Sequence, residues 1–305
     1  LLDYANLELM PAVHPDPQTA KQLKKENLRY ISDQTSGFFR QKADKKFKYY
    51  DFAGKIVKGK PLARIKSLGI PPAWKNVWVC ASPNGHIQAT GIDKKKRKQY
   101  IYHPAWIKLS QQSKFEKIVD FGNNLPKIRQ KVRFDLQGKT LDRKKVLATV
   151  VWLLENTFIR VGNEEYAKEN ESFGLTTLRN KHVKVRGTEI TFQFKGKSGV
   201  YTSVELTNPA IAKTIKHCIE LPGYELFSYI DDLGNRHVVD SEEVNLFLKE
   251  VTNDDFTAKD FRTWGATSLS AKNLFDLGFS PDLKLLKKNI IETVKKVSSH
   301  LNNTV

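Results

Sequence analysis

Cysteine is almost absent from this 305-residue chain, in which only Cys80 and Cys218 are present. Two cysteines supply neither a disulfide framework nor a set of metal ligands, and they fit a reducing, intracellular setting. No apolar run approaches the about 18 residues of a membrane span, and no charged-then-apolar signal segment is present. The chain begins at Leu1 rather than at Met and stops at Val305. We therefore expect a trimmed product or an ordered core.

Acidic residues are outnumbered, since 51 Lys and Arg stand against 33 Asp and Glu and give a net charge of +18. Such a charge attracts polyanions, and the release of counterions from neutralised phosphates drives binding to nucleic acid. A basic housekeeping protein or a ribosome-associated factor would share this composition. Because the chain is long enough for two domains with sizeable cores, we expect a globular protein with a nucleic-acid partner.

Turn-forming residues divide the first third of the chain into short segments. Gly and Pro separate strand-like stretches at 77–80, 87–90 and 100–102. After His103-Pro104 the apolar pattern becomes helical. We predict an α+β protein with a small strand-rich domain over 1–103 and a larger, mainly helical domain over 104–305.

In the second domain, Asp142 is a candidate N-cap for a helix, and Gly162 is a candidate stop just beyond Arg160. Alternating apolar and polar residues over 183–206 predict a small antiparallel sheet with a basic hairpin tip. A last helix is expected to begin with Ser280 as its N-cap. Other helices are expected near 209–219, 241–251 and 257–275. The last helix is predicted to turn five residues inward: Leu283, Leu286, Ile290, Val294 and Val297.

Three stretches place a cation at the end of an element or at a hairpin tip. Arg160 lies in FIRVGNEEYAKENESFGLTTLRNKHV, Lys197 in FKGKSG and Arg262 in KDFRTWGAT, after the helix cap Thr257. If they converge, they suit a phosphate in a transition state, because Arg grips oxygens bidentately and Lys can also release a proton. Spacing alone leaves a second interpretation open: in a chain with 51 Lys and Arg residues, the three can be solvated surface charges.

These stretches resemble the poxvirus-like branch of the type IB DNA topoisomerases, in its bacterial form, across essentially the whole chain. In that family the arginine of F-I-R-x-G, a hairpin lysine and the arginine of K-D-x-R-T-[WY]-G form the catalytic cluster. The resemblance implies these roles for Arg160, Lys197 and Arg262. The run K-E-N-x-[ST]-x-G-L-x-T-L-x-N-K-H also matches, at 168–182. Within it, four residues are expected to contact DNA: Lys168, Asn170, Lys181 and His182.

The segment GIDKKKRKQYIYHPAW, from Gly91, resembles the one by which the family's smaller domain contacts the duplex. Without the family, KKKRK is equally typical of a nuclear-import signal or a solvated face. Five residues are expected at phosphates: Lys94, Lys95, Lys96, Arg97 and Lys98. Three more are expected at groove edges or sugars: Gln99, Tyr100 and Tyr102.

The family has two further catalytic positions. One is the His or Asn of a G-[HN]-T-P motif, and the matching LNNT puts Asn303 there, after Asn302 in place of the common Gly. An amide donates to phosphate without a charge, so its effect should depend less on pH than that of an imidazole. The other position is the nucleophilic tyrosine, which follows shortly after this motif in the family. We expect the natural protein to continue past Val305 through that tyrosine.

The resemblance implies an isomerase that relaxes positive and negative supercoils in double-stranded DNA. The tyrosine would form a 3′-phosphotyrosyl bond and release a 5′-hydroxyl, with Arg160 and Arg262 stabilising the phosphorane and Lys197 as general acid. No ATP, metal or other cofactor is expected, in agreement with the lack of a Gly-rich phosphate loop or an acidic metal cluster. The family implies a monomer that clamps DNA with its two domains, and we expect it in the cytoplasm of a bacterium, at the nucleoid.

Two other functions are compatible with parts of this sequence. A tyrosine recombinase or integrase shares the catalytic core, but it usually has a His shortly before the second arginine, where Lys259, Asp260 and Phe261 stand here. It also usually has an all-helical amino-terminal domain. The other rival is a non-catalytic DNA-binding module, which would describe a chain that lacks the tyrosine.

Overall fold

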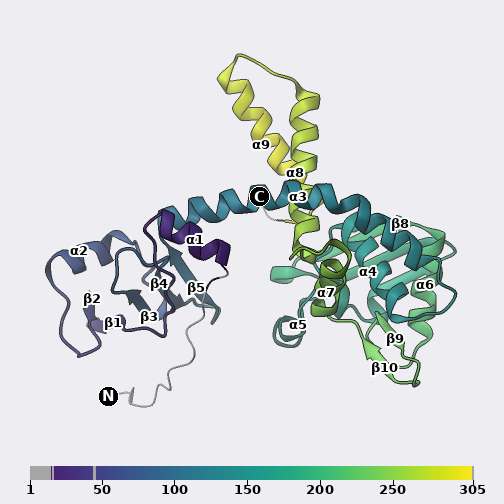
Figure 1. Cartoon of the computed structure of the whole chain (residues 1–305), viewed down its shortest axis with the longest axis horizontal. Coiled ribbons are helices and arrows are strands. Elements are labelled where there is room, and N and C mark those ends of the chain that lie inside the picture. The colour runs from purple at the N-terminus through teal and green to yellow at the C-terminus, as the bar shows by residue number, and fades with distance from the viewer. Residues whose placement is uncertain (1–14, 16, 44–45, 304–305) are drawn as a thin grey trace. The chain divides into compact units, whose positions relative to one another are not determined.

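The computed structural model describes residues 15, 17–43 and 46–303 and divides into two compact units, Leu1–Glu116 and Lys117–Val305 (Figure 1). Helix α3 (Pro104–Leu136) begins at the predicted domain boundary and continues past the division between the units. The limit after His103 stays a prediction. Within the described residues, no helix is long and apolar enough to cross a membrane.

The first unit is built on a five-stranded antiparallel sheet of order β2-β1-β3-β4-β5. Its strands are β1 (Gly37–Ala43), β2 (Lys46–Tyr50), β3 (Lys75–Cys80), β4 (Ile87–Ile92) and β5 (Lys98–Tyr102). The apolar residues of the central strands alternate between the faces of the sheet, and Val77, Val79 and Ala89 form its core with Ile65. The predicted strand-rich region is therefore confirmed.

Two helices accompany this sheet, α1 (Pro17–Lys25) and α2 (Gly59–Ser67). Helix α2 was not predicted, because the Gly and Pro residues around this stretch are typical of turns. Pro61 lies in the first turn of the helix, where a missing backbone N–H is tolerated. The buried Ile65 then holds the helix against the sheet.

The second unit is organised around α4 (Arg143–Thr157), whose residues from Lys145 to Val151 are all buried. Asp142 is its N-cap, as predicted, and accepts a hydrogen bond from the Lys145 N–H at 2.9 Å. The predicted stop at Gly162 is wrong. The helix ends at Thr157, where Phe158 adopts a left-handed conformation (φ 53°) and its N–H bonds to the Leu154 carbonyl.

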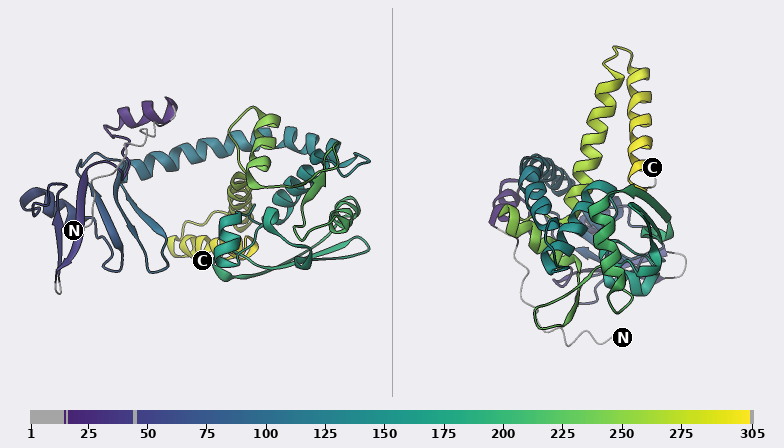
Figure 2. Two further views of the ribbon diagram at one scale, coloured as in Figure 1. Left: turned by 90° about the horizontal axis from the view of Figure 1, so that it is seen from below. Right: turned by 90° about the vertical axis from the view of Figure 1, so that its right-hand side faces the viewer.

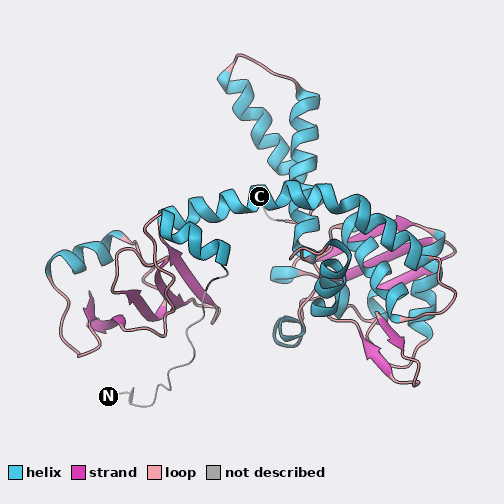
Figure 3. Ribbon diagram, viewed as in Figure 1, coloured by secondary structure: helices cyan, strands magenta, loops and turns pink. Residues whose placement is uncertain are grey.

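A three-stranded antiparallel sheet of order β6-β7-β8 packs against this core and confirms the sheet predicted over 183–206 (Figure 3). Its strands are β6 (Val183–Arg186), β7 (Glu189–Lys195) and β8 (Tyr201–Thr207). On β7, Ile190, Phe192 and Phe194 alternate inward, as a half-buried strand requires. A short hairpin, β9 (Ser228–Ile230) and β10 (Arg236–Val238), lies elsewhere in the unit.

A short helix that the sequence pattern did not predict, α5 (Glu164–Asn170), follows Arg160. The remaining helices agree with the predicted positions to within a few residues: α6 (Pro209–Glu220), α7 (Ser241–Thr252), α8 (Ala258–Leu277) and α9 (Leu283–His300). Asn208 and Asp240 cap α6 and α7, and Thr257 forms a capping box with Asp260 at the start of α8. Helices α8 and α9 run side by side as a hairpin (Figures 1 and 2).

Two details of α9 were predicted wrongly. Its N-cap is Asp282 rather than Ser280, since the Asp282 carboxylate accepts from the Lys284 N–H at 2.8 Å. Of the five residues expected to point inward, Leu283, Ile290 and Val294 are 71%, 52% and 47% exposed.

The rotation of α9 follows from polar contacts at its ends. The Lys296 ammonium donates to Asn273 of α8 at 2.9 Å, and the carbonyl of Leu301 is held by Arg262. Asn289, Thr293 and Val297 are the buried residues of α9, which packs against α8. The apolar face that the periodicity detected therefore stays largely exposed.

Candidate active site

Arg160, Arg262 and Asn303 meet at one point. Arg160 follows α4, Arg262 lies in the second turn of α8, and Asn303 follows α9. The Asn303 Oδ1 atom accepts from the Nη2 of Arg160 at 2.6 Å and from the Nη2 of Arg262 at 3.0 Å. Guanidiniums only donate, so the amide oxygen must face them and the Nδ2 group stays available to donate to a ligand.

Arg262 also joins two segments that are distant in the sequence. One of its Nη atoms donates to the Phe158 carbonyl, and the other donates to the Leu301 carbonyl at 2.8 Å. The Phe158 ring packs against Gly265, where a Cβ would clash with it. Glycine at this position lets the end of α4 approach α8, which brings the Arg160 segment to Arg262.

The backbone of Arg160 is fixed by the segment that begins at Gly174. The Leu175 N–H donates to the Arg160 carbonyl at 2.8 Å, and the Thr176 N–H donates to the Val161 carbonyl at 2.7 Å. A Cβ on Gly174 would clash with the Arg160 carbonyl. The run from 168 to 182 therefore fixes the backbone of Arg160 through hydrogen bonds to its carbonyl and to that of the next residue.

Electrostatics make this point a site for an anion. Burial lowers the pKa of Arg160, and burial together with the charge of Arg160 lowers the pKa of Arg262 to about 10. Both groups stay cationic at neutral pH. Across the described residues, neither guanidinium forms an ion pair. Two cations that share one neutral acceptor favour a bound anion such as a phosphate.

Lys197 is not joined to this cluster. It lies in the short 3-10 turn Lys197–Gly199 between β7 and β8, where Ser198 and Gly199 have φ of 63° and 78°. Its side chain is exposed and makes no hydrogen bond or ion pair to any described residue. A role for Lys197 at the phosphate stays a prediction.

The basic run of the first unit has two kinds of residue. Lys94, Lys95 and Lys96 are exposed at the β4–β5 turn and form no ion pair with described residues. Asp93 organises that turn: it accepts from the Lys95 and Arg97 N–H groups at 2.8 and 2.9 Å and pairs with the Arg97 side chain at 2.8 Å. These contacts, led by the Arg97 N–H, lower the pKa of Asp93 to about 2. The free cations are therefore the three lysines.

The rest of this segment lies on β5. Lys98 pairs with Asp33 at 2.6 Å, and Gln99 donates to Asp93 at 2.9 Å. Tyr100 and Tyr102 are exposed on the face that Lys98 shares, with their ring centroids 5.8 Å apart. The two phenols are thus accessible, whereas Gln99 and Lys98 are already engaged.

The predicted DNA contacts of the second unit also differ in accessibility. Lys168 pairs with Glu164 at 3.2 Å on α5, Asn170 ends that helix, and Lys181 is exposed. His182 is only 9% exposed, and its Nδ1 accepts from the Arg179 N–H at 3.1 Å. Burial and the nearby cations Lys181 and Arg179 lower its pKa. His182 thus holds the turn that begins at Arg179, and its contact with DNA stays a prediction.

The sequence pattern did not single out three groups with defined contacts in the structure: the carbonyls of Phe158 and Leu301, which bind Arg262, and the side chain of Arg179. The F of the F-I-R motif was a visible signal for Phe158. Nothing in the sequence points to the Leu301 carbonyl. Arg179 stands inside the recognised 168–182 run, but its aromatic neighbour Tyr224 lies far along the chain.

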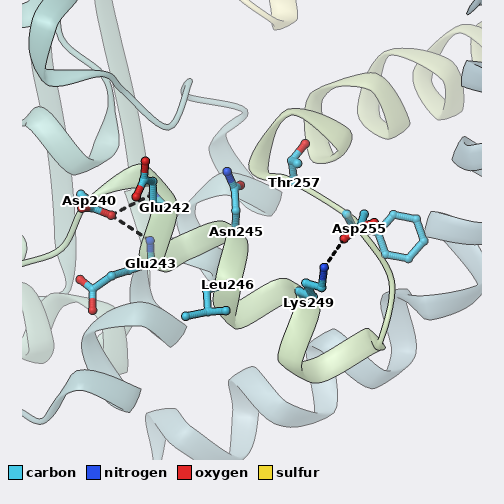
Figure 4. A pocket seen from close by; sticks show the side chains of 9 residues that line it. Asp240, Glu242, Glu243, Asn245, Leu246, Lys249, Asp255 and Thr257 are labelled. Atoms are coloured by element: carbon cyan, nitrogen blue, oxygen red, sulfur yellow. Dashed lines mark hydrogen bonds and ion pairs between the residues drawn. The ribbon is translucent and has the colours of Figure 1, made fainter. Parts of the chain in front are cut away.

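A separate hollow lies along α7 and the loop after it (Figure 4). None of the predicted site residues lines it. Most of its charged groups have partners: Asp240 caps α7, Lys249 pairs with Asp255 at 2.6 Å, and Glu243 pairs with Arg143 at 2.9 Å. Glu242 also lines the hollow, and its carboxylate makes no hydrogen bond or ion pair to a described residue.

Two known protein families match most of the chain. A family described as "Eukaryotic DNA topoisomerase I, catalytic core" matches residues 95–305, and one described as "Bacterial DNA topoisomerase IB, N-terminal domain" matches residues 46–93. The "DNA topoisomerase 1B" of Acanthamoeba polyphaga mimivirus is 36% identical over 276 residues, which are 88% of this chain and 82% of that protein.

Other relatives match over a smaller part of their own length. The "DNA topoisomerase 1B" of Vaccinia virus (strain Copenhagen) is 32% identical over 110 residues, 36% of this chain and 35% of that protein. The "DNA topoisomerase 1" of Mycosarcoma maydis is 28% identical over 176 residues, 52% of this chain and 17% of that protein. On the match over residues 95–305 and the mimivirus relative together, this chain belongs to the type IB DNA topoisomerase family.

Proposed function

We propose that this protein relaxes positive and negative supercoils in double-stranded DNA by cutting and rejoining one strand through a 3′-phosphotyrosyl intermediate. The observation that supports it most is the pair of guanidiniums, Arg160 and Arg262, that share the Asn303 oxygen and have no carboxylate partner among the described residues. A backbone phosphate matches this arrangement in charge and in the number of acceptors it offers.

In the proposed reaction the scissile phosphate binds Arg160 and Arg262 through its non-bridging oxygens, and the Asn303 Nδ2 group donates to the same phosphate. The tyrosine oxygen forms a bond to phosphorus while the bond to the 5′-oxygen breaks. The added negative charge of the phosphorane is stabilised by these donors, and the loss of one such donor typically costs about 2.7–4 kcal/mol.

Proton transfer completes the step. The phenol proton leaves to solvent, and Lys197 gives a proton to the departing 5′-oxygen as general acid. For this the exposed β7–β8 turn must bring the ammonium to the phosphate when DNA is bound. The phosphotyrosyl ester keeps the energy of the cleaved bond, so the reverse reaction reseals the strand without ATP or a metal ion.

The nucleophile is the one group that the described side chains do not provide, because no tyrosine among them forms a hydrogen bond with Arg160, Arg262 or Asn303. From the resemblance to the family we expect this tyrosine shortly after Asn303. We propose that the natural protein supplies it from there, and that the chain up to Val305 binds DNA without cleaving it.

The net charge of +18 and the free Lys94, Lys95 and Lys96 support a polyanionic partner. We propose that the protein acts as a monomer that clamps duplex DNA. In a bacterial cell its substrate would be the DNA of the nucleoid.

Plasmid relaxation tests the function. Supercoiled plasmid is incubated in EDTA without ATP, either with the 305-residue chain or with a form that continues through the family's tyrosine. Relaxation by the longer form alone supports the proposal. Failure of both forms refutes it, and site-specific strand exchange would instead identify a recombinase.

A further inference from the structure

The Arg179 guanidinium lies over two aromatic rings. The carbon at the centre of its guanidinium lies 5.4 Å from the centroid of Phe173 and 5.0 Å from that of Tyr224. Phe173 also packs on the His182 ring, at 4.4 Å between centroids, whereas Tyr224 is 62% exposed. Arginine stacks well on such faces because its cation is planar and weakly hydrated.

The backbone around Arg179 is fixed as well. Its N–H donates to His182, the Leu226 N–H donates to the Leu178 carbonyl at 2.9 Å, and the Asn180 N–H donates to the Tyr224 carbonyl at 3.0 Å. These bonds hold the segments that carry the two rings against each other. Little side-chain entropy is left to lose when a ligand binds.

The donors of this guanidinium are unused. In the part of the chain that the structure describes, the Arg179 side chain makes no hydrogen bond or ion pair. The nearby carboxylates are engaged elsewhere, since Glu225 pairs with Arg236 at 2.9 Å and Glu171 lies 3.9 Å from Lys195. Contact with the two rings uses none of the N–H groups, so these donors stay available for an acceptor such as a phosphate oxygen.

The segment that carries Arg179 is also the one that supports the candidate active site. The Leu175 N–H holds the Arg160 carbonyl at 2.8 Å, and the Phe173 N–H donates to the Lys195 carbonyl at 2.8 Å, two residues before Lys197. A ligand bound at Arg179 therefore contacts the same segment whose backbone hydrogen bonds hold Arg160 and the β7–β8 hairpin.

We propose that Arg179 binds a non-scissile backbone phosphate of duplex DNA and acts as a positioning residue that sets the register of the strand at the active site. This inference rests on the proposed function. It assigns to Arg179 a contact with the phosphodiester backbone rather than with base edges, because the N–H fork of a guanidinium matches the oxygens of a phosphate.

Equilibrium binding of the 305-residue chain to a short duplex, measured over a range of salt concentrations, tests the inference. Arg179→Ala is expected to weaken binding about tenfold and to reduce the slope of log K against log salt by about 0.9, the value for one phosphate contact. Arg179→Lys keeps the charge but loses the planar fork, so it should retain the slope and weaken binding a few-fold. Tyr224→Leu should resemble Arg179→Lys, because it removes one stacking face.

Lys249→Ala is the matched control. It removes the same charge from a lysine that is paired with Asp255 in the α7 hollow, and it should leave the slope unchanged. Thermal unfolding of each variant shows that the fold is retained. If Arg179→Ala unfolds, Arg179→Gln takes its place in the same assay.

A phosphate scan locates the contact. Single phosphates of the duplex are replaced by neutral methylphosphonates, and one position is expected to weaken the wild-type chain about tenfold while leaving Arg179→Ala unaffected. An unchanged slope for Arg179→Ala, the absence of such a position, or a loss confined to one base sequence would overturn the inference alone. A wild-type chain that binds no DNA would overturn the proposed function as well.

Discussion

Asn303→Asp turns the neutral acceptor between Arg160 and Arg262 into an anion. The two acceptor distances of 2.6 and 3.0 Å place the new charge beside both guanidiniums. A pair of unit charges at about 4 Å and an effective dielectric of about 20 is worth about 4 kcal/mol, whereas exposed pairs give only about 0.2–1 kcal/mol. Because Asn303 is exposed and Arg262 half-buried, we expect a net stabilisation of about 1–2 kcal/mol.

For a unit of this size that stabilisation corresponds to a rise of about 2–8 °C in Tm. The two cations depress the pKa of the new carboxylate in the folded state. The added stability is therefore present above the unfolded pKa of about 3.9 and is lost as pH falls through the folded value. The same carboxylate occupies the place of the phosphate, so strand cleavage should fall by at least about 10³-fold, as when an oxyanion donor is removed.

The assay combines thermal unfolding of the 305-residue chain with single-turnover cleavage by a form that carries the tyrosine. Asn302→Asp is the control, because it adds the same charge at the exposed neighbour, which does not contact either arginine. A variant Asn303→Asp that is less stable than Asn302→Asp, or that cleaves DNA at the wild-type rate, would refute the assignment of an anion site.

Three further predictions concern other parts of the chain. Gly265→Ala should destabilise the second unit by about 1–3 kcal/mol in urea unfolding and reduce cleavage, because the added Cβ meets the Phe158 ring. Burial lowers the pKa of His86 in the folded state, so just below about pH 6.5 only the unfolded chain takes up a proton at this residue. The stability of the first unit should therefore be constant above about pH 6.5 and fall as the pH decreases below that value. His86→Gln should flatten this dependence in unfolding curves from pH 5 to 8. Arg97→Ala should lower the salt slope of DNA binding less than alanine at a free lysine, which should lower it by about 0.9, because Arg97 is already paired with Asp93. The free lysines are Lys94, Lys95 and Lys96.

The parts of the fold that sequence could predict are those decided by local chemistry. Asp142 caps α4 because its carboxylate reaches the N–H three residues on, and this depends only on neighbours in the chain. The alternation on β7 likewise shows which side chains face the core. The resemblance singled out Arg160, Arg262 and Asn303, and the structure brings these three together.

The wrong predictions concern features of the fold that depend on contacts between residues far apart in the sequence. Periodicity shows that α9 has an apolar face but not which side its neighbour covers, and contacts to Asn273 and Arg262 settle that side. The end of α4 depends on Phe158, whose carbonyl is taken by Arg262. The partner that stacks on Arg179, Tyr224, lies 45 residues away in the sequence, so no local pattern could reveal it.

The most direct test of the proposed function is the polarity of the covalent DNA–protein link formed by a form of the protein that carries the tyrosine. After denaturation, the fragment of the cut strand that ends in the 3′-phosphate should stay attached to the protein, and the other fragment of the same strand should begin with a free 5′-hydroxyl. Arg262→Ala and Arg160→Ala should each reduce this product by at least about 10²-fold. Attachment through a 5′-phosphate, or full cleavage by either variant, would contradict it.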